Sequence, residues 1–185
     1  MPRELAGPVP FCPVSDSPAP PPADGRWYAL VVRPNHEKAV DERLRGRGLA
    51  ALCPSYQVRR RWSDRAKIVD LPLFRGYVFC HFSYGERIAA LSTPGVRSVV
   101  SFGPAPEPIP EEEIEALQSI HRSGVPAQPW PYLRAGRRVR IVSGCLEGLE
   151  GRLLREKDLL RVVVSVDMLM RSVAVEVDRE TVLPI

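Results

Sequence analysis

Hydrophobic positions from residue 27 onward fall into short strand-like runs that alternate with helical segments. The first run, Trp27–Arg33, is rich in aromatic and β-branched residues, as strands commonly are. After it, Asn35 is a suitable N-cap for a helix that extends to about Arg47, in which Val40 and Leu44 share one face at i, i+4 spacing. The ordered part of the chain is therefore predicted to open with a strand and a helix.

Further segments continue this alternation as far as Gly124, which ends a helix whose inward spacing is Ile114, Leu117 and His121. The pattern predicts strands at 49–62, 66–82 (interrupted near its middle) and 96–102, and helices at 85–95 and 109–124. This β-α-β-β-α-β order with a closing helix predicts an α+β domain. We expect a four-stranded antiparallel sheet with helices on one face, because two longer helices and one short helix can cover only one face.

The texture changes beyond residue 133, where helical periodicity gives way to five short β-branched runs separated by glycines. So short a sheet must close to bury its apolar face, which predicts a small five-stranded β-barrel. Eight of the twenty prolines lie before Arg26, so the start of the chain is predicted to be a disordered tail. The predicted divisions are a tail (1–25), a first domain (26–123), a semi-rigid Pro-rich linker (124–133) and the barrel domain (134–185).

Composition and charge exclude several classes of protein. The chain is 44% hydrophobic and 26% charged, with a net charge of +4. Arginine supplies all the basic residues except Lys38, Lys67 and Lys157, and its forked guanidinium group suits phosphate contacts. No apolar run approaches the roughly 20 residues of a membrane span. The N-terminus also lacks the basic and apolar regions of a signal peptide, so we expect a cytoplasmic protein.

Metal, cofactor and catalytic sites are not expected. Cys12, Cys53, Cys80 and Cys145 are too widely spaced for a zinc cluster or a disulfide framework. The acidic run at residues 111–115 is explained by the preference of a helix N-terminus for acids. The histidines have no partners at the spacing of a catalytic triad, so the sequence predicts no enzyme.

One aromatic strand leaves three functions open. In the stretch 71–82 (LPLFRGYVFCHF), Tyr77 and Phe79 point to one face of a strand. They are core residues, or a platform for RNA bases, or a docking surface for a protein. RNA is suggested because the stretch matches the RNP1 pattern, with mismatches at Val78 and Cys80. A protein partner is suggested because a sheet face that helices leave bare is a large apolar patch.

The barrel domain favours the third possibility. Its stretch 137–154 leads from a strand into glycines at 144, 148 and 151 with Leu146 between them, which resembles the KOW motif. The first domain then resembles an NGN domain at WYAL, RPNHEK and PLFRGYVF. Together the two domains are similar to the NusG/RfaH family of bacterial transcription elongation and antitermination factors. The RRRWSDRAK stretch is close to specialised paralogues of the UpxY and LoaP branches, which implies an operon-specific factor.

The family resemblance implies partners for three sets of residues. It implies that the bare sheet face binds the clamp helices of RNA polymerase and so suppresses pausing or termination, through Val31, Phe74, Tyr77, Phe79 and Ile109. It implies upstream or non-template DNA, and possibly nascent RNA, as partners of Arg33, Arg43, Arg47, Arg59, Arg60, Arg61 and Trp62. It implies a small-subunit ribosomal protein or the Rho terminator as partner of the KOW loops, at Leu146, Leu149, Met168 and Leu169.

We expect a monomer that uses no cofactor. The alternative function is an RRM-like RNA-binding protein that uses the aromatic strand, with the KOW domain as a second RNA or ribosome contact.

Overall fold

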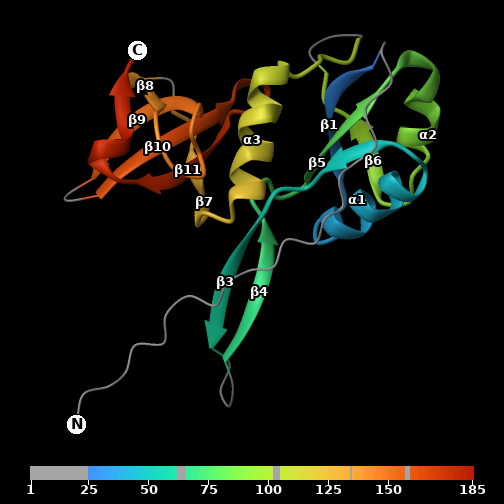
Figure 1. Cartoon of the computed structure of the whole chain (residues 1–185). Coiled ribbons are helices and arrows are strands. Elements are labelled where there is room, and N and C mark those ends of the chain that lie inside the picture. The colour runs from blue at the N-terminus through green and yellow to red at the C-terminus, as the bar shows by residue number, and fades with distance from the viewer. Residues whose placement is uncertain (1–24, 62–65, 102–104, 134, 157–158) are drawn as a thin grey trace.

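The structure is a computed structural model of the 185-residue chain, and it describes residues 25–61, 66–101, 105–133, 135–156 and 159–185 (Figure 1). The tail predicted for residues 1–25 lies outside the described residues apart from Gly25. The described chain forms two units, an N-terminal unit from β1 to α3 and a C-terminal unit from β7 to β12.

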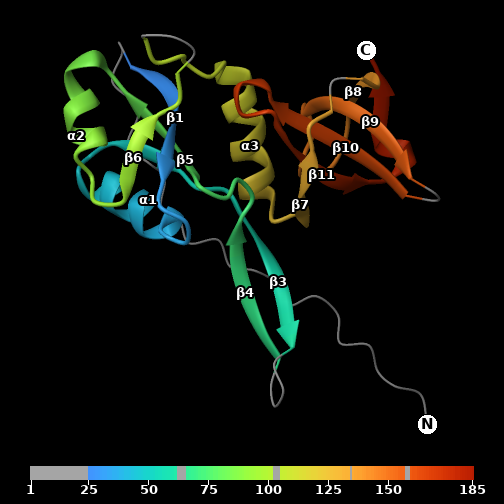
Figure 2. The same ribbon diagram turned by 180° about the vertical axis from the view of Figure 1, so that it is seen from behind.

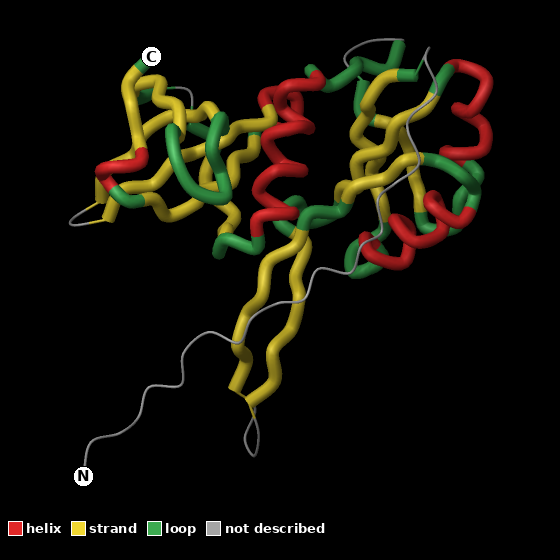
Figure 3. Tube along the Cα trace, in the orientation of Figure 1, coloured by secondary structure: helices red, strands yellow, loops and turns green. Residues whose placement is uncertain are grey.

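The N-terminal unit is built on a four-stranded antiparallel sheet in the order β2-β5-β1-β6, as the sequence pattern predicts. Its strands are β1 (Arg26–Val32), β2 (Ala50–Leu52), β5 (Tyr77–Phe82) and β6 (Val96–Val99). A separate hairpin of β3 (Ser55–Arg61) and β4 (Ala66–Pro72) projects away from the body of the molecule (Figures 1 and 3). The helices are α1 (Glu37–Gly46), α2 (Arg87–Leu91), which follows the short turn η1 (Tyr84–Glu86), and α3 (Glu111–Ser123).

Two helix boundaries differ in detail from the sequence prediction. The N-cap of α1 is His36, and Asn35 instead has a positive φ of 63°, which asparagine tolerates better than most residues. In α3 the buried positions are Ile114, Leu117 and Ile120, and His121 is exposed. Gly124 ends α3 in the left-handed conformation, as expected for a glycine at that position.

The expectation that all helices lie on one face of the sheet is wrong. Helices α1 and α2 cover the face that carries Val78, Cys80 and Phe82, because these residues share one buried cluster with Val40 of α1 and Ala90 of α2. Helix α3 covers the opposite face, where its apolar residues join a second cluster with the aromatic side chains of β1 and β5. Both ribbon views show α3 between this sheet and the C-terminal unit (Figures 1 and 2). The sheet is therefore covered on both faces.

The C-terminal unit is a strongly curved six-stranded antiparallel sheet in the order β12-β8-β9-β10-β11-β7 (Figure 1). Its strands are β7 (Ala127–Pro131), β8 (Arg137–Ile141), β9 (Glu150–Glu156), β10 (Leu159–Val166), β11 (Arg171–Val177) and β12 (Val182–Pro184), with the turns η2 (Asp167–Leu169) and η3 (Arg179–Thr181). The five strands expected after residue 133 are present. The sixth, β7, comes from the Pro-rich segment expected as a linker, and it pairs with β11.

Close packing explains one glycine of the KOW-like turn. A Cβ atom on Gly151 would lie 2.6 Å from a methyl carbon of Val162 and 2.8 Å from the carbonyl oxygen of Val163. Gly144 and Gly148 serve differently, because their φ values of 93° and 87° lie in the left-handed region. The glycine spacing therefore records two tight backbone turns and one close strand contact.

A single buried hydrophobic cluster connects the two units. It runs from Trp27 and Phe79 of the first sheet, through the apolar face of α3, to Val164, Val166 and Val173 of the C-terminal unit. Helix α3 also lies against β10 in the backbone trace. The structure is thus a closed arrangement, in which α3 serves as a shared wall of both units.

Within the described ranges, no helix combines the length and the apolar character that crossing a membrane requires. The same described residues contain no group of three or more His, Cys, Asp or Glu side chains placed to hold a metal ion.

Candidate partner-binding surface

The Arg75–Gly76 step positions the aromatic strand. Gly76 has a φ of 83°, a conformation that favours glycine. Its backbone N–H donates a hydrogen bond to the buried carboxylate of Glu37 over 2.8 Å, and its carbonyl oxygen accepts one from Val32 over 2.9 Å. These contacts tie the start of α1 to the start of β5, which places Tyr77 opposite Val31 in the sheet register.

The aromatic face is a packed apolar surface under α3. The rings of Phe74 and Phe79 meet edge to face with 5.2 Å between their centroids, and both side chains are fully buried. Ile109 is also buried and bridges to Trp27 of β1. The expected bare face is therefore covered in this arrangement, because α3 and the C-terminal unit pack on it.

Tyr77 lies at the edge of this face and differs from the two phenylalanines. Its side chain is only half-buried, and so is that of its neighbour Val31. The guanidinium carbon of Arg171, from the start of β11, lies 5.4 Å from the centroid of the Tyr77 ring. This distance is within the range of a cation–π interaction, so an arginine of the C-terminal unit covers the most accessible aromatic residue of the N-terminal unit.

A second polar contact joins the units at the N-terminal end of α3. The backbone N–H of Asp167, in the turn between β10 and β11, hydrogen-bonds to the carboxyl group of Glu113. Burial raises the pKa of Glu113 to about 7, and the nearby carboxylate of Asp167 adds to the shift. Tyr132, after β7, donates a hydrogen bond over 2.9 Å to the carboxylate of Asp167.

The KOW-loop residues expected to contact a partner lie mostly inside the molecule. Leu146, Leu149 and Leu169 are buried in the cluster that connects the units, and Met168 is half-buried against it. The exposed apolar residue of this turn is Met170, whose φ of 50° turns the chain into β11. Period-2 alternation does not extend through such a turn, so the sequence pattern could not distinguish Met170 from its neighbours.

Two of the predicted nucleic-acid contacts hold the fold together. Arg43 donates a hydrogen bond over 2.8 Å to the carbonyl oxygen of Pro94. Arg47 donates bonds of 2.7 Å to the carbonyl oxygen of Ala89 and 3.0 Å to the hydroxyl of Ser92. Both arginines therefore fasten α1 to the segment between α2 and β6.

The other predicted nucleic-acid contacts fall into two groups. Arg33 follows β1 and is exposed. The backbone of Arg59–Arg61 belongs to β3 of the projecting hairpin, but the side chains of these arginines lie outside the described part, and so does Trp62 entirely.

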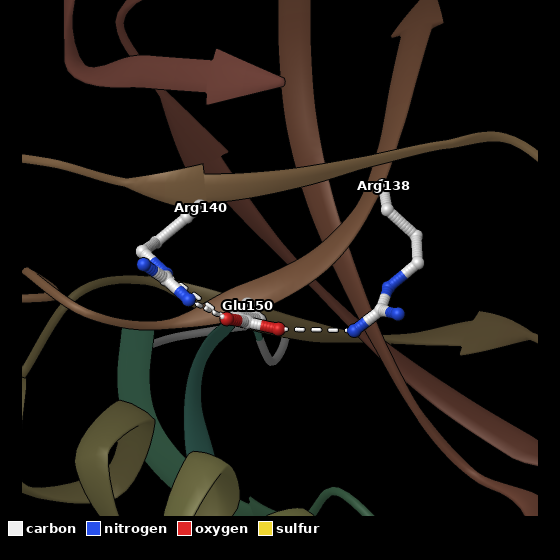
Figure 4. Close-up of polar contacts among 3 residues, drawn as sticks. All are labelled: Arg138, Arg140 and Glu150. Atoms are coloured by element: carbon white, nitrogen blue, oxygen red, sulfur yellow. Dashed lines mark hydrogen bonds and ion pairs between the residues drawn. The ribbon is translucent and has the colours of Figure 1, made fainter. Parts of the chain in front are cut away.

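A charged cluster on β8 and β9 was not singled out from the sequence (Figure 4). Arg138 donates a hydrogen bond over 3.0 Å to one carboxylate oxygen of Glu150. Arg140 donates to the other oxygen through Nε over 2.9 Å and through a terminal nitrogen. Arg140 and Glu150 are direct cross-strand partners, so the cluster reinforces the register of the two strands that flank the KOW-like turn.

The buried thiols have no reactive environment. Burial raises the pKa of both Cys53 and Cys80 to about 12, so these side chains stay protonated. Cys145, at the tip of the KOW-like turn, is exposed.

Comparison with known proteins places the N-terminal unit in a family. A sequence model of the family described as "NusG: Transcription termination factor nusG" matches residues 25–118. A solved structure described as domain interaction in Thermotoga maritima NusG is similar to this chain, with 23% sequence identity and a TM-score of 0.52. That similarity covers 87% of this chain and 97% of the other. No curated protein matches the chain.

Proposed function

The chain belongs to the NusG family of transcription factors, and from this premise we propose that it binds RNA polymerase through the α3-covered aromatic face and suppresses pausing or termination. The family is one of non-catalytic factors, so the chain acts by binding. We further propose that it serves a particular operon and acts in the cytoplasm beside the polymerase. The coiled-coil clamp helices of the polymerase are the proposed partner of this face.

The observation that carries the proposal is the composition of this face. Phe74, Phe79 and Ile109 form a preassembled apolar floor, with Tyr77 and Val31 at its accessible edge. A helix pair binds well to a groove that offers rigid aromatic anchors, because such anchors lose little conformational entropy on binding. The buried phenylalanines shape the site, and Tyr77 provides the contact.

Polymerase binding requires the C-terminal unit to move, because this unit packs on α3 and Arg171 covers Tyr77. The similar structure from Thermotoga maritima is described by its domain interaction, and the present chain has an interface between its own two units. We propose that the closed arrangement is the resting state and that polymerase binds the open one.

We propose two further sets of contacts. Arg33 and the projecting β3–β4 hairpin contact upstream or non-template DNA, with possible extension to nascent RNA. Met168 and Leu169 of the C-terminal unit contact a ribosomal protein or Rho once the unit has left α3. The hairpin supports the first proposal because it reaches well away from the body of the molecule (Figure 3).

The test is a binding titration of the full chain with core RNA polymerase. Tyr77→Ala should weaken binding at least about tenfold, because losing an aromatic anchor commonly costs more than 1 kcal/mol. Tyr84→Ala is the matched control, since Tyr84 is exposed in η1, which precedes α2 on the other side of the sheet. Equal binding by the wild type and a folded Tyr77→Ala variant would place the docking surface elsewhere.

A titration with free single-stranded RNA addresses the RRM-like alternative. Base stacking needs an exposed ring, and Phe79 is fully buried in the closed arrangement. We therefore expect weak RNA binding that does not depend on Tyr77. Tight, Tyr77-dependent binding would favour the RNA-binding function instead.

A further inference from the structure

An acidic contact lies at the boundary between the two units. Glu113 is in the first turn of α3, and its partner Asp167 begins the turn η2 of the C-terminal unit. The contact brings a carboxyl group of one unit against a carboxylate of the other. Like charges at such a contact oppose closure, because each disfavours the ionised form of the other.

The surroundings of Glu113 satisfy only half of its hydrogen-bonding capacity. One carboxyl oxygen accepts the backbone N–H of Asp167. The oxygen Oε2 is buried and, among the described residues, has no hydrogen-bond partner. A buried carboxylate oxygen without a partner carries a substantial desolvation penalty, whereas the protonated group is neutral and offers a donor.

The charged groups around Glu113 come from each element that meets there. On its own helix, Glu112 adds a second negative charge, and Asp167 adds one from η2. Tyr132, at the end of β7, donates its hydroxyl to Asp167. The nearest basic residue of β11 with a known position is Arg171, whose guanidinium group lies over the ring of Tyr77. The charges that act on Glu113 across the boundary are therefore negative.

We propose that Glu113 is a proton-controlled latch between the two units. In its protonated form it holds the turn η2 against α3, and loss of its proton releases the C-terminal unit. The latch concerns only the two units of this chain. Its consequence, that a rise in pH uncovers Tyr77 for polymerase, rests on the proposed function.

The direction of the effect follows from proton linkage. Closure raises the pKa of Glu113 from its ordinary 4.5 to about 7, so the closed arrangement binds the proton more tightly. The proton-linked stabilisation of closure is complete below the ordinary value, declines as the pH rises, and is lost once the pH passes about 7. Since one pKa unit corresponds to a factor of ten in the equilibrium, the ratio of open to closed molecules should rise more than about tenfold over this window.

Energy transfer between two dyes on the full chain measures this ratio without polymerase. Cys145 is an exposed thiol in the C-terminal unit, and Ser98→Cys provides a second site on β6 of the N-terminal unit. Cys12→Ser removes the thiol of the tail, and Cys53 and Cys80 are buried. The transfer efficiency is recorded from about pH 5 to about pH 8.5, which spans the titration window.

We expect transfer to fall with rising pH, with a midpoint near the titration of Glu113. Glu113→Gln should remain closed throughout, because the amide is neutral and isosteric with the protonated acid. Asp167→Asn should move the midpoint to lower pH by removing the opposing charge. Glu112→Gln is the matched control on the same helical turn, and it should retain most of the wild-type profile, since Glu112 is exposed.

A pH-independent wild type, or a Glu113→Gln variant with the wild-type profile, would overturn the latch. Carbon-13 NMR of the Glu113 carboxyl group in the unsubstituted chain gives its titration midpoint independently of any variant, and an ordinary midpoint would also overturn it. If the units separate as expected but polymerase affinity does not rise with pH, the latch stands and the proposed function fails.

Discussion

The guanidinium group of Arg171 lies over the ring of Tyr77, with 5.4 Å between the guanidinium carbon and the ring centroid. The two residues are far apart in the sequence and belong to different units. Tyr77 is the most accessible aromatic residue of the candidate docking face, so this contact couples the position of the C-terminal unit to the exposure of that face.

Removal of this contact should loosen the closed arrangement. Arg171→Ala should shift the open–closed equilibrium toward the open form by a few-fold, because an exposed cation–π contact contributes about 0.5–1 kcal/mol. The dye-pair measurement described above, at constant pH, reports the shift. Arg97→Ala, on an exposed position of β6, is the control and should leave the equilibrium unchanged.

Phe79 should be essential for folding as well as for the shape of the docking face. It is fully buried against Phe74, so Phe79→Ala should lower the free energy of unfolding by about 3–5 kcal/mol. Chemical denaturation followed by circular dichroism measures the loss. Tyr84→Ala, at a highly exposed aromatic position, should change it by less than about 0.5 kcal/mol. A loss as small as that for Phe79→Ala would contradict the packing seen here.

Gly151 should not tolerate a side chain. Gly151→Ala places a methyl group 2.6 Å from a methyl carbon of Val162 and 2.8 Å from the carbonyl oxygen of Val163, so backbone must shift. We expect a loss of about 1–3 kcal/mol in the unfolding free energy of the C-terminal unit. Gly46→Ala, at the end of α1, has nothing within 4 Å of the new atom and should be neutral or slightly stabilising.

The thiols should react in an order set by burial. Cys145 is exposed, whereas burial raises the pKa of Cys53 and Cys80 to about 12. In a Cys12→Ser background at neutral pH, iodoacetamide should label Cys145 first, because the thiolate is the reactive form. Mass spectrometry of the peptides identifies the modified residue. Labelling of Cys80 in the folded protein at the rate of Cys145 would show that β5 is not packed as described.

His81 should make the N-terminal unit less stable in mild acid. It is buried against Trp27, and burial lowers its pKa below 6.5. A lowered pKa means that the unfolded chain binds the proton more tightly. The stabilisation from neutral His81 is therefore full above the unfolded pKa and declines as the pH falls below about 6.5.

His81→Phe keeps the ring and removes the titration, so its stability should depend less on pH between about 5 and about 7 than that of the wild type. Thermal melts at several pH values measure this difference. His36→Gln, at an exposed position, should keep the wild-type dependence. Parallel curves for wild type and His81→Phe would exclude His81 as the source.

Local patterns in the sequence were sufficient to predict the strands, the helices and the division into two units. Period-2 alternation placed Val78, Cys80 and Phe82 on one face of β5, and these residues do lie under α1 and α2. The glycines at 144, 148 and 151 predicted a tight turn between strands, because glycine alone allows a positive φ and the closest backbone contacts. The same residues identified the family resemblance, which the family match confirms.

The tertiary structure alone decided which surfaces meet. Periodicity shows which side chains of α3 share a face, but not which side of the sheet that face covers, because the choice depends on contacts between residues distant in sequence. The same reason applies to the pairing of β7 with β11, to the burial of Phe79, Leu146, Leu149 and Leu169, and to the contacts of Arg171 and Glu113 with the opposite unit. The sequence thus determined the elements and the family, and the packing of one shared helix determined that the candidate docking face is covered.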